Sequence, residues 1–138
     1  MLAIDFRDLR YCIEEDAQIY QDDPFTGIAR QYNHEGALVA EYSYVNGDKD
    51  GLTRYWYPSG ELLGEDHYRN ASLHGPSREW YQNGQLKREA EYELSILVKD
   101  KKWDECGKLV EDFVLTENDP LFKTLQDFWD IYGKNLPK

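Results

Sequence analysis

The feature of this 138-residue sequence that most constrains its fold is a repeat with a period of 24 residues. A segment that starts with glycine recurs three times, and its second half recurs in step with the first. The recurring positions are Gly27, Gly51 and Gly75; Arg30, Arg54 and Arg78; Gly36, Gly60 and Gly84; Leu38, Leu62 and Leu86; Glu41, Glu65 and Glu89; and Tyr44, Tyr68 and Tyr92. A degenerate fourth copy, with Trp103 and Gly107, lies one residue earlier than the period of 24 residues would place it. A fixed period of this length indicates a repeat array, in which one structural unit packs on the next.

Each unit has the pattern of a β-hairpin. Two runs of residues alternate apolar or aromatic with polar side chains, as half-buried strands do. Segments rich in Asn, Pro, Ser and Gly separate the two runs, at residues 33–36, 58–60 and 82–84. Such residues supply the backbone conformations that tight turns need. We therefore predict a mainly β fold, a single-layer antiparallel meander of β-hairpin repeats in one twisted sheet.

The repeat also predicts how the strands pair. Counting across the second turn places Arg54 opposite Glu65, and opposite charges across a strand pair stabilise a sheet by roughly 0.2–1 kcal/mol each. The same count gives the other predicted pairs, which are Arg30 with Glu41, Arg78 with Glu89, Tyr57 with Leu62 and Trp56 with Leu63. Tyr32, Trp56 and Trp80 then share a face with the charges. The opposite face carries Tyr55, Tyr57, Leu62, Tyr68, Tyr81, Leu86 and Tyr92.

The length fits a single domain, residues 1–138, with three parts. Residues 1–23 are expected to form N-terminal cap strands, of which 10–13 and 17–20 begin the sheet as the atypical end that repeat arrays need. Residues 24–112 hold the hairpin repeats, and residues 113–138 hold a C-terminal helix and tail.

The C-terminal part carries the signals of one amphipathic α-helix over residues 120–132. An Asn-Asp pair precedes Pro120, which suits a first helical turn. Apolar residues then recur at helical spacing, at Leu121, Leu125, Phe128, Trp129 and Tyr132, and Gly133 marks the end. We expect this helix to dock on the last strands or on the sheet edge, where it would cover exposed backbone. The alternative is a helix that itself binds a partner.

The charge balance restricts the kind of partner. The chain has 27 acidic and 16 basic residues, a formal net charge of −11. This balance disfavours nucleic acid and anionic membranes, both of which attract basic proteins. It favours a cationic protein partner, whose approach would be steered electrostatically. The alternative is that the net charge only keeps the protein soluble.

Cysteine usage and hydropathy indicate the compartment. Cys12 and Cys106 are far apart in sequence and lack metal-ligand spacing, so free thiols in a reducing compartment are expected. The N-terminus has no apolar signal-peptide core, and no stretch approaches the length of a membrane span. We therefore predict a cytoplasmic protein.

The sequence offers little catalytic chemistry. His34, His67 and His74 make no zinc-type pattern with one another, no serine lies in a nucleophile elbow, and no glycine-rich phosphate loop occurs. The glutamates of the repeat recur three times, which suits a structural role better than that of a single general base. We predict no enzymatic activity, no catalytic residue, no cofactor and no metal.

The aromatic and arginine residues of the repeat have two interpretations. In the structural one, Trp56, Trp80 and Trp103 stack across neighbouring hairpins and stabilise a sheet that has no second layer. In the functional one, exposed Trp, Tyr and Arg side chains form a binding surface, since these residues are enriched at interface hot spots.

Residues 51–62 and 75–86 resemble the MORN-repeat variant found in YwqK-type antitoxins. The resemblance lies in a glycine-led strand that ends in Trp-Tyr, followed by a Ser-Gly or Asn-Gly turn and a leucine, and it extends over roughly residues 24–112. It implies an antiparallel hairpin array in a bacterial protein that neutralises a toxin. Similar proteins with a closing Trp-Asp-x-x-Gly unit resemble immunity proteins encoded beside polymorphic toxins. Other MORN proteins are tied to membranes or to scaffolding. The fourth unit departs from the pattern, with Lys99 where the leading glycine would fall.

We therefore predict an immunity protein that binds a cognate, basic toxin, such as a nuclease, and occludes its active site. The alternative is a MORN-type scaffold or membrane-proximal adaptor. A third and weaker alternative is an enzyme whose site is built by the tail. The predicted partner-binding residues are exposed acids and aromatic anchors, namely Glu14, Glu15, Asp16, Asp22, Asp23, Asp48, Asp50, Asp66, Tyr55, Trp56, Trp80 and Tyr81.

Overall fold

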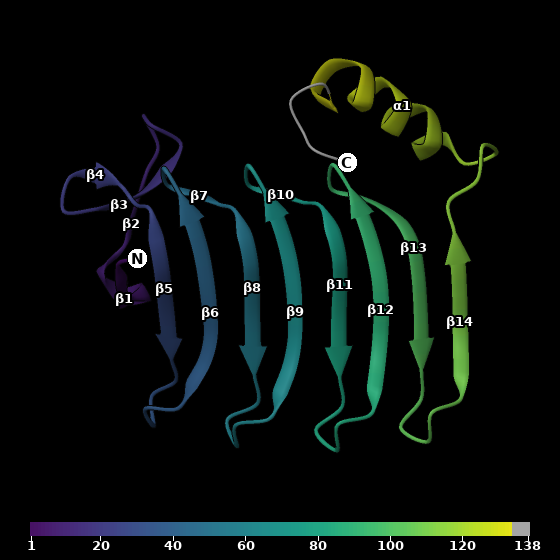
Figure 1. Cartoon of the computed structure of the whole chain (residues 1–138), viewed down its shortest axis with the longest axis horizontal. Helices are drawn as coiled ribbons and strands as arrows, with labels where there is room; N and C mark the ends of the chain where they lie inside the picture. The colour runs from purple at the N-terminus through teal and green to yellow at the C-terminus, as the bar shows by residue number, and fades with distance from the viewer. Residues whose placement is uncertain (134–138) are drawn as a thin grey trace.

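The four repeat units fold as four antiparallel β-hairpins that lie side by side in one sheet (Figure 1). The computed structural model describes residues 1–133, so the last five residues of the predicted tail lie outside the described part. The hairpins are β5 (Gly27–Tyr32) with β6 (Leu38–Val45), β8 (Gly51–Trp56) with β9 (Leu62–Arg69), β11 (Gly75–Trp80) with β12 (Leu86–Glu93), and β13 (Ile96–Trp103) with β14 (Leu109–Val114). The predicted fold class, a mainly β meander of hairpin repeats with one C-terminal helix, is confirmed.

Short strands mark the first two links between hairpins. β7 (Asp48–Lys49) pairs with the end of β6, and β10 (Ser72–Leu73) pairs with the end of β9. The turn before β7 uses positive φ angles at Asn46 and Gly47, of 49° and 86°. Asparagine and glycine tolerate this left-handed conformation better than other residues. Each link therefore turns the chain back before it enters the next hairpin.

The predicted charge register is confirmed. Arg54 pairs with Glu65, and the equivalent pairs Arg30–Glu41 and Arg78–Glu89 occupy the same places in their hairpins. The register predicted nearer the turn is wrong, because a β-bulge shifts it by one residue. Trp56 lies opposite Leu62, not Leu63, and the backbone N–H of Tyr57 bonds to the carbonyl of Glu61, not Leu62. The inserted residue also puts Leu62 on the face of Trp56, since a shift of one residue exchanges the two faces. The same bulge puts Leu86 opposite Trp80.

The N-terminal part differs from the prediction. The strands at residues 10–13 and 17–20 exist, as β2 (Arg10–Cys12) and β3 (Ala17–Tyr20), but they do not begin the main sheet. With β4 (Asp23–Pro24) they form a separate three-stranded sheet. The edge of the main sheet is β1 (Ala3–Asp5), which runs parallel to β5 and continues into the 3-10 helix Phe6–Asp8.

A small core joins the N-terminal segment to the first hairpin. Phe25, Ala29 and Tyr44 are buried there, and Phe6 and Tyr20 pack against them. Farther along the sheet several small residues on one face are buried, namely Ala40, Thr53, Ser77 and Ala90. Small side chains can be buried without a second layer because larger neighbours on adjacent strands cover them.

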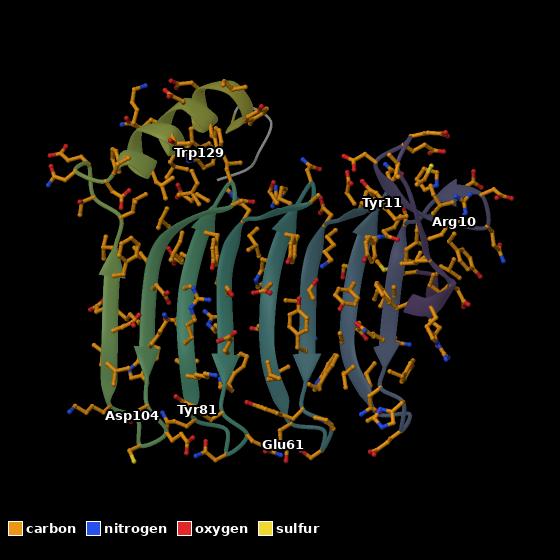
Figure 2. The ribbon with its side chains drawn as sticks, turned by 180° about the vertical axis from the view of Figure 1, so that it is seen from behind. Arg10, Tyr11, Glu61, Tyr81, Asp104 and Trp129 are labelled. Atoms are coloured by element: carbon orange, nitrogen blue, oxygen red, sulfur yellow. The ribbon has the colours of Figure 1, made fainter. Side chains whose placement is uncertain are left out.

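The helix α1 (Pro120–Tyr132) has the predicted bounds, and Asp119 caps it by accepting a hydrogen bond from the N–H of Leu121 at 2.9 Å. Its apolar stripe packs on the end of β13, where Leu125 is buried with Ile96 and Leu115. The indole N–H of Trp129 donates to Glu93 at 3.0 Å (Figure 2). The helix therefore lies across one end of the last strands and leaves the long edge of β14 uncovered (Figure 1).

Candidate protein-binding surface

The structure gathers six of the predicted acidic residues at the N-terminal end of the molecule. The turn between β2 and β3 carries three of them, the turn before β4 and the first position of β4 carry two, and the first position of β7 carries the sixth. These residues, called the acidic end below, are Glu14, Glu15, Asp16, Asp22, Asp23 and Asp48. All are exposed except Asp48, which is half-buried. Five of the six therefore offer carboxylates to solvent.

Backbone hydrogen bonds hold the small sheet against the first link. The N–H of Gln18 donates to the carbonyl of Gly47 at 3.0 Å, and the N–H of Gly47 donates to the carbonyl of Phe25 at 2.7 Å. A side chain at Gly47 would collide with Ala17, because a Cβ there would lie 2.5 Å from the Cβ of Ala17. The close approach that glycine permits thus brings β2 and β3 beside the link that carries Asp48.

Few positive charges neutralise the acidic end. The guanidinium of Arg10 lies 3.5 Å from Asp22, with both side chains exposed, so this pair is weak. The hydroxyl of Tyr11 donates to Asp16, and that hydrogen bond raises the pKa of Tyr11. Arg10 and Tyr11 lie on the small sheet, at the opposite end of the molecule from Asp104 and β14 (Figure 2). The acidic end thus carries mostly unpaired negative charge, distributed over both ends of the small sheet.

Two predicted contact residues lie elsewhere and have internal partners. Asp50 accepts a hydrogen bond from the N–H of Asn70 at 3.0 Å, which joins two successive links of the sheet. Asp66, on β9, accepts from the hydroxyl of Ser77 at 2.5 Å. Both side chains are half-buried. Their hydrogen bonds indicate structural roles, and the structure does not bring them to the acidic end.

Tyr55 belongs to a row of tyrosines on the face that carries the buried small residues. Its ring lies 6.2 Å from that of Tyr42, edge to face. Burial raises the pKa of Tyr55. The ammonium of Lys49 sits 4.7 Å from the ring centre of Tyr42 and 5.1 Å from that of Tyr68. The sequence did not reveal this cation–π site, since Lys49 lies in a link outside the repeat pattern.

Trp56, Trp80 and Tyr81 lie near the hairpin turns. The predicted stacking of the tryptophans is wrong, because none of Trp56, Trp80 and Trp103 makes a ring–ring contact within residues 1–133. Equivalent positions of successive repeats are two strands apart, about 10 Å, which exceeds the reach of ring contacts. The hydroxyl of Tyr81 instead donates to the carbonyl of Trp103 at 2.9 Å, and Tyr57 makes the equivalent bond to Trp80 at 2.8 Å.

Two equivalent hollows lie between successive hairpin turns. One, of about 250 Å³, is lined by Leu38, Trp56 and the turn 58–60. The next, of about 340 Å³, is lined by Leu62, Trp80 and the turn 82–84. Glu61 and Tyr81 mark this row of turns in Figure 2. The leucines were missed as lining residues because the bulge that turns them to the tryptophan face has no strong sequence signal.

The three histidines of the described part have separate surroundings. His34 is exposed, His67 bonds to the carbonyl of Pro76 at 2.8 Å, and His74 accepts from the N–H of Leu94 at 3.1 Å. Cys12 and Cys106 are free thiols. Across residues 1–133, no group of three or more His, Cys, Asp and Glu side chains could hold a metal ion.

The comparison with known families agrees with the hairpin architecture. Residues 49–70 and 73–94 match the family model described as MORN repeat variant. These segments are MORN repeats. They cover the second and third hairpins, which match the repeat pattern most closely. No curated protein sequence and no solved structure matches the chain. Over the described residues, no helix is both long and apolar enough to span a membrane.

Proposed function

We propose that this MORN-repeat protein is a non-enzymatic immunity protein that binds a basic bacterial toxin and occludes its active site. The observation that carries the proposal is the acidic end, where exposed carboxylates gather beside one weakly paired arginine. The resemblance of residues 51–62 and 75–86 to the repeats of YwqK-type antitoxins supports the same function.

Electrostatic attraction increases the rate at which such a protein associates with its partner and the selectivity of that association. A formal charge of −11 attracts cationic partners over a Debye length, about 10 Å at 0.1 M salt. Because association is often limited by orientation, a charged patch at one end raises the rate and aligns the partner. Rapid capture suits an inhibitor that must act before a toxin reaches its target.

The acidic end would act on its partner by mimicry of charge. A nuclease binds phosphates with clustered basic side chains, and carboxylates held on tight turns can occupy the same positions. The backbone of the small sheet is tied to the first link at Gly47, so these carboxylates are presented by an ordered scaffold. Ordered contacts lose less conformational entropy on binding.

The first experiment is affinity purification of the tagged protein from its native cell, with identification of what co-purifies. One stoichiometric basic partner that is toxic when expressed alone, and harmless when co-expressed with this protein, is expected. Several weak partners would contradict the proposal. Binding to lipid vesicles without a protein partner would favour a membrane-proximal scaffold instead.

The second experiment tests the acidic end with the purified pair. Reversing three exposed charges, Glu14→Lys, Glu15→Lys and Asp23→Lys, should slow association at least tenfold at low salt and flatten its salt dependence. A matched control changes the net charge equally at exposed sites elsewhere, by Glu35→Lys, Glu105→Lys and Glu117→Lys. Equal slowing by both variants would show that only net charge matters and would refute the assignment of the acidic end.

A further inference from the structure

The two edges of the main sheet differ. At the N-terminal edge, β1 has three residues and is followed directly by a 3-10 helix, so little backbone is free to pair. At the other edge, β14 has six residues, all exposed, and it is the outermost strand in Figure 1. Natural proteins usually shorten or cover such edges, because free N–H and C=O groups pair with other strands.

β14 combines an open edge with an exposed apolar surface. Leu109, Val110, Phe113 and Val114 are all exposed large hydrophobic residues, and they flank two adjacent acids, Glu111 and Asp112. Because successive side chains point to opposite faces, each face of this strand carries one acid and at least one apolar side chain. An added strand could therefore make side-chain contacts with β14 on both faces of the sheet.

The charge pattern of the sheet is incomplete at this edge. Inside the sheet, Glu65 contacts basic residues on both neighbouring strands, Arg54 at 3.6 Å and Arg78 at 3.7 Å. At the edge, Glu111 contacts Lys102 of β13 at 2.9 Å, and no described strand lies on its other side. A further strand with a basic residue opposite Glu111 would complete the arrangement that the sheet already uses around Glu65.

Pairing of β14 with a second copy of itself is disfavoured. In a two-fold antiparallel pair, residues that lie opposite one another must be on the same face. The two registers that overlap β14 most fully then place either Glu111 or Asp112 directly opposite its own copy. Like charges directly opposite destabilise a strand pair. The two acids of this edge therefore favour pairing with a different strand, one that carries basic residues.

We infer that the outer edge of β14 is a strand-addition site for an extended segment with two adjacent basic residues flanked by apolar residues. The backbone of the segment pairs with β14. Its basic side chains face Glu111 and Asp112, one on each face of the sheet, and its apolar side chains cover Val110 and Phe113. This site lies at the opposite end of the sheet from the acidic end and does not depend on the proposed function.

The test uses the full chain and a synthetic peptide with blocked ends, in which two adjacent arginines are flanked by valines. Saturable binding is expected, with amide exchange slowed within Leu109–Val114 and unchanged at the acidic end. Replacing Glu111 and Asp112 by Gln and Asn should weaken binding about tenfold, because two opposite-charge pairs are lost. This variant keeps side-chain size, so circular dichroism should show the native sheet.

Two controls separate strand addition from simple charge attraction. A peptide whose alternate amides are N-methylated keeps its charge but cannot complete the backbone pairing, so it should not bind. The variant Asp22→Asn with Asp23→Asn removes the same charge at the acidic end and should bind the unmodified peptide normally. Absence of binding, equal binding of the methylated peptide, or protection at the acidic end in place of β14 would overturn the inference. Sedimentation that shows a dimer abolished by the β14 variant would also overturn it.

Discussion

Removing one partner of the ion pair between Arg88 and Asp100 is expected to cost more stability than breaking any other charge pair among the described residues of the sheet. Arg88 on β12 donates to the two carboxylate oxygens of Asp100 on β13, at 2.8 and 3.0 Å, and also to the hydroxyl of Tyr92 at 3.2 Å. The two side chains are 20% and 8% exposed. The hydrogen bond to Asp100 raises the pKa of Arg88. The pair is therefore bidentate and largely removed from water.

The expected cost of Asp100→Asn follows from this burial. Removing one partner of a fully buried pair costs about 3–5 kcal/mol, since the other charge is left without compensation. Arg88 is a fifth exposed and can regain some hydration, so we expect about 2–3 kcal/mol. With a urea dependence of about 1.5 kcal/mol/M, the unfolding midpoint should fall by about 1.3–2 M.

The matched control is Glu89→Gln, one position from Arg88 on the same strand. Glu89 accepts from Arg78 at 3.0 Å, but these side chains are 44% and 38% exposed. Exposed pairs contribute about 0–1 kcal/mol, so this variant should shift the midpoint little. Equal shifts for the two variants would refute the argument from burial. Replacing Arg88 by Met and Asp100 by Leu together should recover most of the loss.

Two further results are expected. Gly47→Ala and Gly84→Ala should each lower the free energy of unfolding by about 1–2 kcal/mol, because the two glycines have φ near +86° and +87°. In urea unfolding Gly47→Ala should lose stability beyond this amount, since its Cβ would meet Ala17, whereas Gly84 has open space. Only Gly47→Ala should also release the small sheet to proteolysis. Burial raises the pKa of Tyr44 to about 12, so this residue should ionise after the exposed tyrosines in an ultraviolet titration. Its contribution to the free energy of unfolding should be fully present below pH 10. This contribution should decline between about pH 10 and 12, where Tyr44 ionises only in the unfolded chain.

Much of the fold followed from the sequence because its signals are local. A hairpin joins residues that are close in the chain, so alternation and turn chemistry are sufficient to define it. The Arg–Glu pairs, such as Arg54 with Glu65, recur with the repeat and fix the strand register. The helix at Pro120–Tyr132 carried its own capping residue and apolar stripe. The bulge beside Trp56 escaped prediction because it adds one residue to a strand without a distinctive residue type.

The candidate surface was only partly predictable. The sequence named acids by their exposure in turns, but the approach of β3 to Gly47 decided which of them form the acidic end. Asp66 was predicted as an exposed contact residue like these acids, yet its hydrogen bond with Ser77 on the next hairpin gives it a structural role. Such distinctions depend on contacts between segments far apart in the chain.

The sequence by itself determined the repeat unit, the pairing of its arginines with its glutamates and the terminal helix, because these depend on neighbours within one hairpin or one helical turn. Only the tertiary structure decided the parallel pairing of β1 with β5, the separate N-terminal sheet, the Arg88–Asp100 pair and the open edge at β14. A three-residue strand has no periodicity to reveal its partner. The openness of an edge likewise depends on where every other element has packed, and no local pattern records that.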